Sequence, residues 1–190
     1  SVVKAVSMHP DMEDSDVVDS SPYTIEVAAP TFDPTGGTFT GQAEVNIESA
    51  TPGAQIRCTT NGDEPTESTE VCAMPVVVTE TGSIIKAVAT KEGMSVSAVA
   101  SLQSALVIRA VPPSISPDGG TFTESSTVTL SCANPTAKIY YTLDGSTPTA
   151  EALVYTEPIV VSDTGTVVKA IAVADGKAPS EALVSHLFKI

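Results

Sequence analysis

Two cysteines are the side chains whose chemistry the sequence indicates most clearly. Cys58 and Cys72 have counterparts 83 residues later along the chain, Tyr141 and Tyr155. Because both tyrosines are exchanged for cysteine together, we predict that the two positions touch across neighbouring strands and that the cysteines form a disulfide. Closing a loop of about 15 residues would stabilise the fold by about 3 kcal/mol in the chain-entropy model. The bond also predicts an oxidising compartment, extracellular or at the cell surface; the alternative is two buried free thiols.

The third cysteine, Cys132, has no such partner. It falls in phase with Val128 and Leu130, so we expect it to face the core as a small apolar residue. The alternative is a bond between chains. No Cys/His spacing indicates a zinc site, and no metal is predicted.

The remaining candidates for catalysis form no recognisable arrangement. His9 and His186 are the only histidines, and neither lies near a Ser or Cys motif of nucleophilic type. A carboxylate pair for glycoside hydrolysis needs a cleft and a fixed separation, which a domain of this size rarely offers. We therefore predict that the protein is not an enzyme and has no cofactor.

An acidic segment, His9–Pro22, is predicted to be a solvated loop. A calcium site is the alternative, but its carboxylates lack the spacing and the turn glycine of a known calcium-binding loop. These carboxylates are Asp11, Glu13, Asp14, Asp16 and Asp19.

Composition excludes several classes of partner. The 190 residues carry a formal net charge of −14, which repels phosphate backbones and anionic membranes, so no nucleic-acid partner is expected. No apolar run is long enough to span a bilayer. There is no N-x-Ser/Thr acceptor, although the many Thr, Ser and Pro residues would permit O-linked glycans. Because the chain begins at Ser1, we expect a processed chain or a piece of a longer one.

An internal repeat organises the chain. Shifting the sequence by 83 positions places Pro34 on Pro117 and continues without a gap through the shared core. We therefore predict two domains, residues 29–111 and 112–190. The matched pairs include Gly36/Gly119, Gly37/Gly120, Thr38/Thr121, Phe39/Phe122, Thr59/Thr142, Gly62/Gly145, Pro65/Pro148, Lys86/Lys169, Ala87/Ala170 and Ala89/Ala172.

Short apolar runs separated by turn residues predict an all-β fold. No segment has a helical period, and turn signals recur every 8–12 residues, as in a two-sheet sandwich of immunoglobulin or fibronectin type III kind. Pro34–Gly37 should break the first strand so that it pairs with both sheets. Asn61-Gly62-Asp63 predicts a hairpin turn. Residues 71–79, 153–161 and 183–190 are each expected to contain one strand.

Residues 1–28 are predicted to be part of a third copy. Ser1–Val6 matches Ser83–Val88 and Thr166–Ile171, and Tyr23–Val27 alternates as a final strand should. Two strands alone cannot bury a core, so strands from elsewhere must complete them. Either neighbouring repeats of a longer chain or a second copy of this one would supply those strands, by strand addition in the latter case.

The motifs of the last domain resemble a known module. Gly119–Phe122, Ile139–Thr149 and Val168–Ser180 are similar to the immunoglobulin-like repeat named after the C-terminal domain of chitobiase and β-hexosaminidase. They are weaker in the preceding copy, where Arg57-Cys58 replaces Tyr140-Tyr141. The resemblance implies a non-catalytic appendage of secreted and surface proteins. No part of the chain resembles the catalytic glycosidase domain.

An apolar outer face is the remaining candidate for binding. We expect Val167, Ile171 and Val173 to point outward beside Tyr140, and Val2, Val3 and Val6 to be available in the partial copy. Such a face is typical of a surface covered by another subunit; the alternative is a β-branched strand with modest exposure.

Two functions follow from these observations. The favoured one is a non-catalytic module of a surface fibre, pilus-like filament or adhesive stalk, completed between chains. The alternative is a carbohydrate-binding accessory module of a secreted glycoside hydrolase, with Tyr140 as a stacking platform for sugar.

Overall fold

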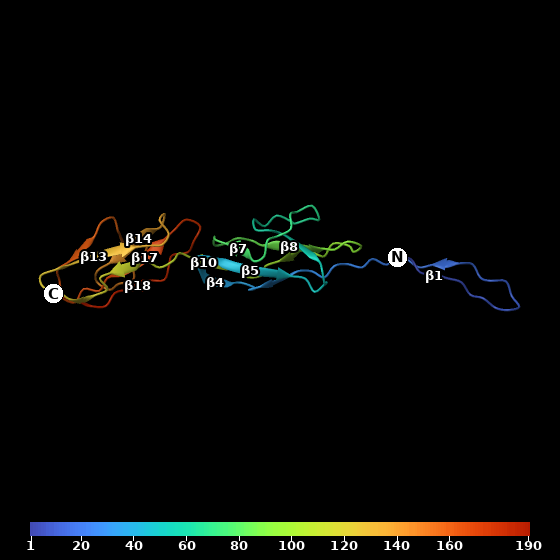
Figure 1. Cartoon of the computed structure of the whole chain (residues 1–190), viewed down its shortest axis with the longest axis horizontal. Helices are drawn as coiled ribbons and strands as arrows, with labels where there is room; N and C mark the ends of the chain where they lie inside the picture. Colours follow the sequence, from blue (N-terminus) through green and yellow to red (C-terminus); the bar gives the residue numbers. More distant parts are fainter.

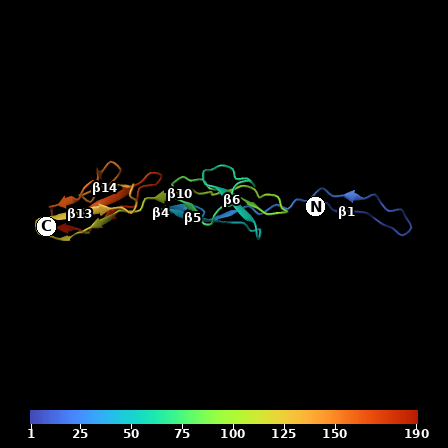
Figure 2. The same ribbon diagram turned by 45° about the horizontal axis from the view of Figure 1, so that its top comes forward.

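The computed structural model describes all residues from 1 to 190, and β-strands are its only regular elements. Figure 1 shows three parts in a line. We call them the hairpin (residues 1–28), the middle module (29–111) and the C-terminal module (112–190). Figure 2 shows the hairpin projecting away from the middle module in a second view. No helix is long and apolar enough to cross a membrane. The all-β prediction is confirmed.

The middle module is a sandwich of two antiparallel sheets. One sheet contains β3 (Thr31–Asp33), β5 (Ala43–Glu48) and β7 (Val76–Val78). The other contains β6 (Gln55–Thr59), β8 (Lys86–Thr90) and β9 (Ala100–Ser101), and a parallel pair is formed by β4 (Gly37–Thr40) and β10 (Leu106–Arg109). Buried and exposed residues alternate along β5, because successive side chains of a strand point to opposite faces.

The C-terminal module repeats this arrangement. Its first sheet contains β11 (Ser114–Ser116), β13 (Ser126–Ser131) and β16 (Ile159–Val161). Its second contains β15 (Leu153–Val154), β14 (Lys138–Thr142), β17 (Lys169–Val173) and β18 (Leu183–Val184), and β12 (Gly120–Thr121) pairs in parallel with β19 (Phe188–Lys189). Each module has its own core. The middle core consists of Ala43, Val45, Ile47, Val76, Val78, Ile85, Ala87, Leu106 and Ile108, and the C-terminal core of Val128, Leu130, Ile139, Ile159, Val161, Val168, Ala170 and Phe188.

The predicted break in the first strand of each module is confirmed. β3 pairs antiparallel with β5, and after the break β4 pairs in parallel with β10. Glycine is required at the break because another segment approaches closely. A Cβ added to Gly36 would lie 2.3 Å from the Cβ of Ser104, and one added to Gly119 would lie 2.6 Å from the carbonyl oxygen of His186.

Three strands predicted as single elements instead divide between sheets. Residues 153–154 pair with β14, whereas β16 pairs with β13 in the opposite sheet. Pro158 lies between the two pieces and has no amide hydrogen to donate to a ladder. In the middle module Val71 pairs with Arg57 while β7 pairs with β5. Residues 183–190 divide in the same way into β18 and β19.

The predicted turn at Asn61-Gly62-Asp63 is present, but it does not connect the two strands of a tight hairpin. Val71 is the first residue after β6 that pairs antiparallel with that strand, at Arg57, so a loop longer than a tight turn connects β6 to it. Asn61 instead accepts the backbone N–H of Asp63 at 3.1 Å and donates to its carboxylate at 2.6 Å, which makes a local turn.

The hairpin contains β1 (Lys4–Ala5) and β2 (Val18–Asp19), which pair antiparallel. The acidic segment is therefore not wholly a loop, because β2 lies within it. Lys4 and Asp19 are direct cross-strand partners and their side chains form an exposed ion pair at 3.0 Å. An exposed pair of this kind contributes little to stability.

Candidate functional site at the module junctions

The predicted disulfide is present. Cys58 and Cys72 are bonded, with their Cα atoms 5.8 Å apart, and both pack against the middle core. At the same place in the C-terminal module, the rings of Tyr141 and Tyr155 meet edge to face with centroids 6.5 Å apart. The joint exchange of two tyrosines for two cysteines thus reflects a contact between the two positions in each module.

Cys132 lies at a boundary between modules. It is half-buried, packs against both the C-terminal core and a small cluster of alanines, and its thiol lies 3.5 Å from the carbonyl oxygen of Val111. Its counterpart Ser49 donates to the carbonyl oxygen of Ala28 at 2.7 Å. Each side chain therefore contacts the backbone of the segment that precedes the first strand of its module, at Val111 and at Ala28.

The two histidines lie in different parts of the chain and share no site. His186 pairs with Asp118 at 2.9 Å on the surface, and the ring of His9 accepts only the backbone N–H of Asp11. No group of three or more His, Cys, Asp or Glu side chains is arranged to hold a metal ion.

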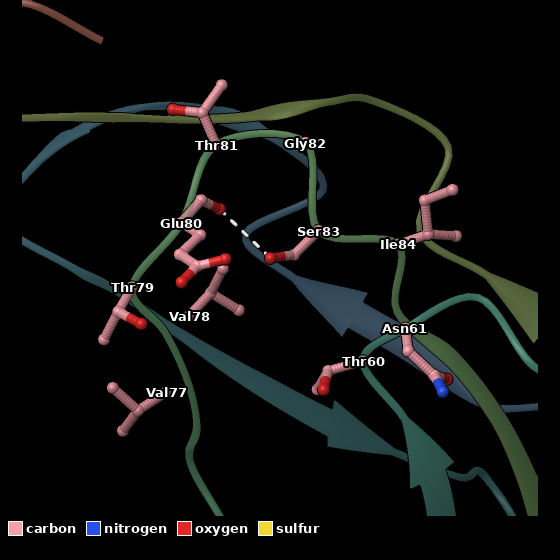
Figure 3. A pocket seen from close by; sticks show the side chains of 10 residues that line it. All are labelled: Thr60, Asn61, Val77, Val78, Thr79, Glu80, Thr81, Gly82, Ser83 and Ile84. Atoms are coloured by element: carbon pink, nitrogen blue, oxygen red, sulfur yellow. Dashed lines mark hydrogen bonds between the residues drawn. The ribbon is translucent and has the colours of Figure 1, made fainter. Parts of the chain in front are cut away.

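A hollow of about 460 Å³ lies beside the turn that follows β7 in the middle module (Figure 3). The turn is closed by a hydrogen bond of 3.0 Å from the Ser83 hydroxyl to the carbonyl oxygen of Glu80. Glu80 is the one titratable side chain in the lining. The hollow therefore does not contain the carboxylate pair on which glycoside hydrolysis depends.

The predicted apolar outer face is only partly formed. Tyr140, Val167 and Val173 are half-buried and Ile171 is 4% exposed, so Ile171 contributes no exposed apolar surface to this face. β17 is an inner strand of its sheet, and Tyr140 lies directly opposite Ile171 on β14. A long side chain on the neighbouring strand shields this position. Whether the other three residues form an interface stays a prediction.

The contact between the two complete modules uses backbone hydrogen bonds. The Ala178 N–H donates to the carbonyl oxygen of Ile108 at 2.8 Å, and the Ala110 N–H donates to the carbonyl oxygen of Ala178 at 2.9 Å. The end of β10, the last strand of the middle module, thereby pairs in parallel with the loop after β17, Arg109 lying opposite Ala178. Ala110 is also buried against Ala172 and Ala174, so apolar packing supports these bonds.

Further polar contacts surround this pair of bonds. The Thr81 N–H donates to the carbonyl oxygen of Gly176 at 2.7 Å. The ammonium group of Lys177 donates to the carbonyl oxygen of Thr79 at 2.7 Å and also to that of Gly41. A Cβ added to Gly176 would lie 2.9 Å from the Cγ of Glu80, which shows how closely the two modules approach.

The hairpin contacts the middle module through two backbone hydrogen bonds that are equivalent to those between the two complete modules. The Ser95 N–H donates to the carbonyl oxygen of Ile25 at 2.8 Å, and the Val27 N–H donates to the carbonyl oxygen of Ser95 at 3.0 Å. Ser95 corresponds to Ala178 under the repeat shift of 83 residues. Glu26 pairs with Ser95 as Arg109 pairs with Ala178. The boundary geometry is therefore a repeating feature of the chain.

The hairpin also reproduces the internal bonding of a complete module. The Ser20 N–H donates to the carbonyl oxygen of Val3 at 2.8 Å, as the Ser185 N–H does to that of Val168 at 2.8 Å. The reverse bonds, from the amides of Val3 and Val168 to the two serine hydroxyls, are each 2.9 Å long. The hairpin thus has the conformation of β17, β18 and their connection.

The side chains that would face a core are exposed in the hairpin. Val3 is 57% exposed, whereas its counterparts Ile85 and Val168 are 0% exposed. Tyr23 is 62% exposed, whereas Phe188, at the same place, is 0% exposed. The Tyr23 N–H donates to the carbonyl oxygen of Ser1 at 2.7 Å as that of Phe188 does to Thr166 at 3.0 Å, so the backbone positions correspond.

One carboxylate in the C-terminal module has a perturbed titration. The Ser146 hydroxyl at 2.6 Å and the Ser146 backbone N–H at 2.9 Å hold the pKa of Asp144 below its usual range. Because the pKa is depressed in the folded state, the stabilisation is present above the unfolded-state pKa and is lost as the pH falls through the folded-state pKa.

We predict that Ser146→Ala raises the pKa of Asp144 towards its ordinary value, since the hydroxyl is the largest cause of the shift. An NMR titration of the Asp144 carboxyl carbon measures this directly. Thr147→Ala is the control and should leave the titration unchanged. An Asp144 titration unaffected by Ser146→Ala would contradict the assignment.

Comparison with known proteins adds a family match. The family model described as the chitobiase/beta-hexosaminidase C-terminal domain matches residues 34–101 and 117–185, once in each complete module. The comparison with curated proteins gives no match.

Several solved structures resemble the chain. The fibronectin(III)-like modules of Clostridium thermocellum CbhA are 17% identical, cover 84% of this chain and 94% of their own, and have a TM-score of 0.27. The N-terminal four Ig domains of Dscam1 isoform 8.4 are 11% identical, with 98% of this chain and 46% of that chain covered and a TM-score of 0.30. Murine CEACAM1b is 11% identical, with 88% and 98% covered and a TM-score of 0.27.

Proposed function

The chain belongs to the chitobiase/β-hexosaminidase C-terminal domain family. We propose that it is a non-catalytic, extracellular structural module of a surface fibre or stalk. One observation carries the proposal. The same two backbone hydrogen bonds join the hairpin to the middle module and the middle module to the C-terminal module. A contact that repeats head to tail without closing on itself generates a linear array.

Two further observations support this function. The Cys58–Cys72 disulfide suits an oxidising compartment outside the cell. The hairpin has the backbone of the last strands of a module but an exposed apolar face, so further strands are needed to complete it. A second copy and neighbouring repeats of a longer chain are the two sources. O-linked glycans on exposed Thr and Ser residues are compatible with such a surface.

Electron microscopy of the native material tests the proposed function. We expect filaments or beaded stalks made of a regular series of modules. Dispersed monomers alone, in material taken from the cell surface under non-denaturing conditions, would contradict a fibre.

Replacing Lys177 by methionine is expected to loosen the junction between the complete modules. The substitution removes the ammonium group that donates to Thr79 and Gly41, and methionine is the residue at the corresponding position, Met94. Small-angle X-ray scattering should show a broader distribution of interatomic distances, while the melting temperature of each module changes little.

Lys189→Met is a matched control at an exposed position in the same module, and it should leave the scattering unchanged. If Lys177→Met gave the same scattering curve as the unaltered chain, the ammonium group would not hold the two modules in line.

A carbohydrate-binding accessory module of a secreted glycoside hydrolase is the second candidate. The family match favours it, because the family is described by the C-terminal domain of chitobiase and β-hexosaminidase. Tyr140, half-buried on β14, is its proposed stacking residue. A glycan array distinguishes the two functions. Specific sugar binding that is lost in Tyr140→Ala would favour the accessory module over the fibre.

A further inference from the structure

We propose that the partner of the hairpin is a polypeptide segment that forms the first six strands of such a module, β11 to β16 of residues 112–165 being the example in this chain. This inference rests on the proposed function and names the partner in it. One such segment would cover two separate surfaces, the open face of the hairpin and a loop of the middle module.

The first surface is the core-facing side of the hairpin. In the C-terminal module, Val168 and Phe188 are buried by packing with β13 and β16 of the opposite sheet, in a core that includes Val128 and Ile159. Val3 and Tyr23 are at the corresponding places and are exposed. The strands that bury these positions in the complete module come from residues 112–165, so the same set of strands fits the hairpin.

The second surface is the loop after β8 in the middle module. In its counterpart, the loop after β17, the carbonyl oxygen of Gly176 accepts a hydrogen bond from the Thr81 N–H. Gly176 also lies close to the side chain of Glu80. The corresponding glycine in the middle module is Gly93, where an added Cβ would meet no atom within 4 Å. The turn that makes this contact in the middle module is residues 79–82, and its repeat in the C-terminal module ends at Gly165.

One occupant fits both surfaces. The first strands of a module would cover the hairpin face, and the turn that follows those strands would contact the loop after β8. A second folded copy does not offer such strands. In both complete modules of a folded copy, the first strands are already paired within their own sheets, and their core side chains are buried. Donation by a second copy would require one of its modules to unfold.

A fusion protein tests the proposal. Residues 112–165 are joined directly to Ser1 of the full chain, because Ser1 is at the position of Thr166. We expect hydrogen exchange at the amides of Val3, Ser20 and Tyr23 to slow by at least about 100-fold, as these bonds become part of a cooperative unit. Exchange at Met94 and Ser95 should slow as well.

Val3→Asp in the fusion is the control, since it places a carboxylate in the new core, and it should abolish the protection. The same substitution in the unfused chain should leave thermal unfolding unchanged, because Val3 is exposed there. A second fusion carries residues 29–82 in place of 112–165. It shows whether a failure of the first fusion is due only to the particular side chains of residues 112–165.

Two results would overturn the proposal. One is hairpin exchange that changes by less than about 3-fold in both fusions. The other is concentration-dependent dimerisation of the unfused chain that Val3→Asp abolishes, because two hairpins would then cover each other. Neither result bears on the Lys177 scattering experiment, which tests the array in the unfused chain.

Discussion

Replacing Phe188 by alanine is expected to lower the free energy of unfolding of the C-terminal module by about 3–5 kcal/mol. Phe188 is fully buried, stacks on Phe122 with ring centroids 5.9 Å apart and lies within the C-terminal core. Its removal leaves a cavity that the sheets cannot close. Denaturant unfolding followed by NMR signals of each module separately measures the loss.

The matched control is Tyr23→Ala in the hairpin. Tyr23 corresponds to Phe188 in backbone hydrogen bonding but is largely exposed, so its removal should change stability by less than about 0.5 kcal/mol. Equal losses for the two substitutions would mean that the hairpin face is already covered. No loss for Phe188→Ala would contradict the assignment of the core.

Removing the disulfide should have the second largest effect. Cys58→Ser with Cys72→Ser is expected to cost the middle module about 3 kcal/mol, because the bond restricts a loop of about 15 residues in the unfolded chain. The C-terminal module has no disulfide and should unfold as before. Separate unfolding transitions of the two modules measure the difference.

Two variants make this experiment specific. Cys132→Ser removes the free thiol and should be close to neutral, because serine is the residue at the equivalent position, Ser49. Cys58→Tyr with Cys72→Tyr reproduces the edge-to-face contact of the C-terminal module and should recover part of the lost stability. A middle module that is equally stable with and without the disulfide would contradict its structural role.

The fold could be predicted largely because the chain contains it more than once. Two copies related by one shift show which residues tolerate exchange, and the exchange of Tyr141 and Tyr155 for cysteines located a contact between strands. Gly36 and Gly119 marked the break in the first strand because no other residue fits the close approach found there.

The junctions could not be predicted in the same way. They depend on backbone groups of Ala178 and Ser95, which carry no side-chain signal, and these two residues differ between the copies. One signal was available: Ile25-Glu26-Val27 and Ile108-Arg109-Ala110 share an alternation that continues past the end of each module. The burial of Ile171 was not predicted, because strand periodicity shows which face a side chain points to and not whether a neighbouring side chain covers it.

Hydrogen exchange of the unaltered full chain, resolved by residue, tests the central claim most directly. The amides of Ala110 and Ala178 should exchange as slowly as those of the module cores, because they join two complete modules. The amides of Val3 and Ser20 should exchange rapidly, although their hydrogen bonds match those of Val168 and Ser185. Rapid exchange at Ala110 and Ala178, or slow exchange at Val3 and Ser20, would contradict the account of a rigid junction beside an open third module.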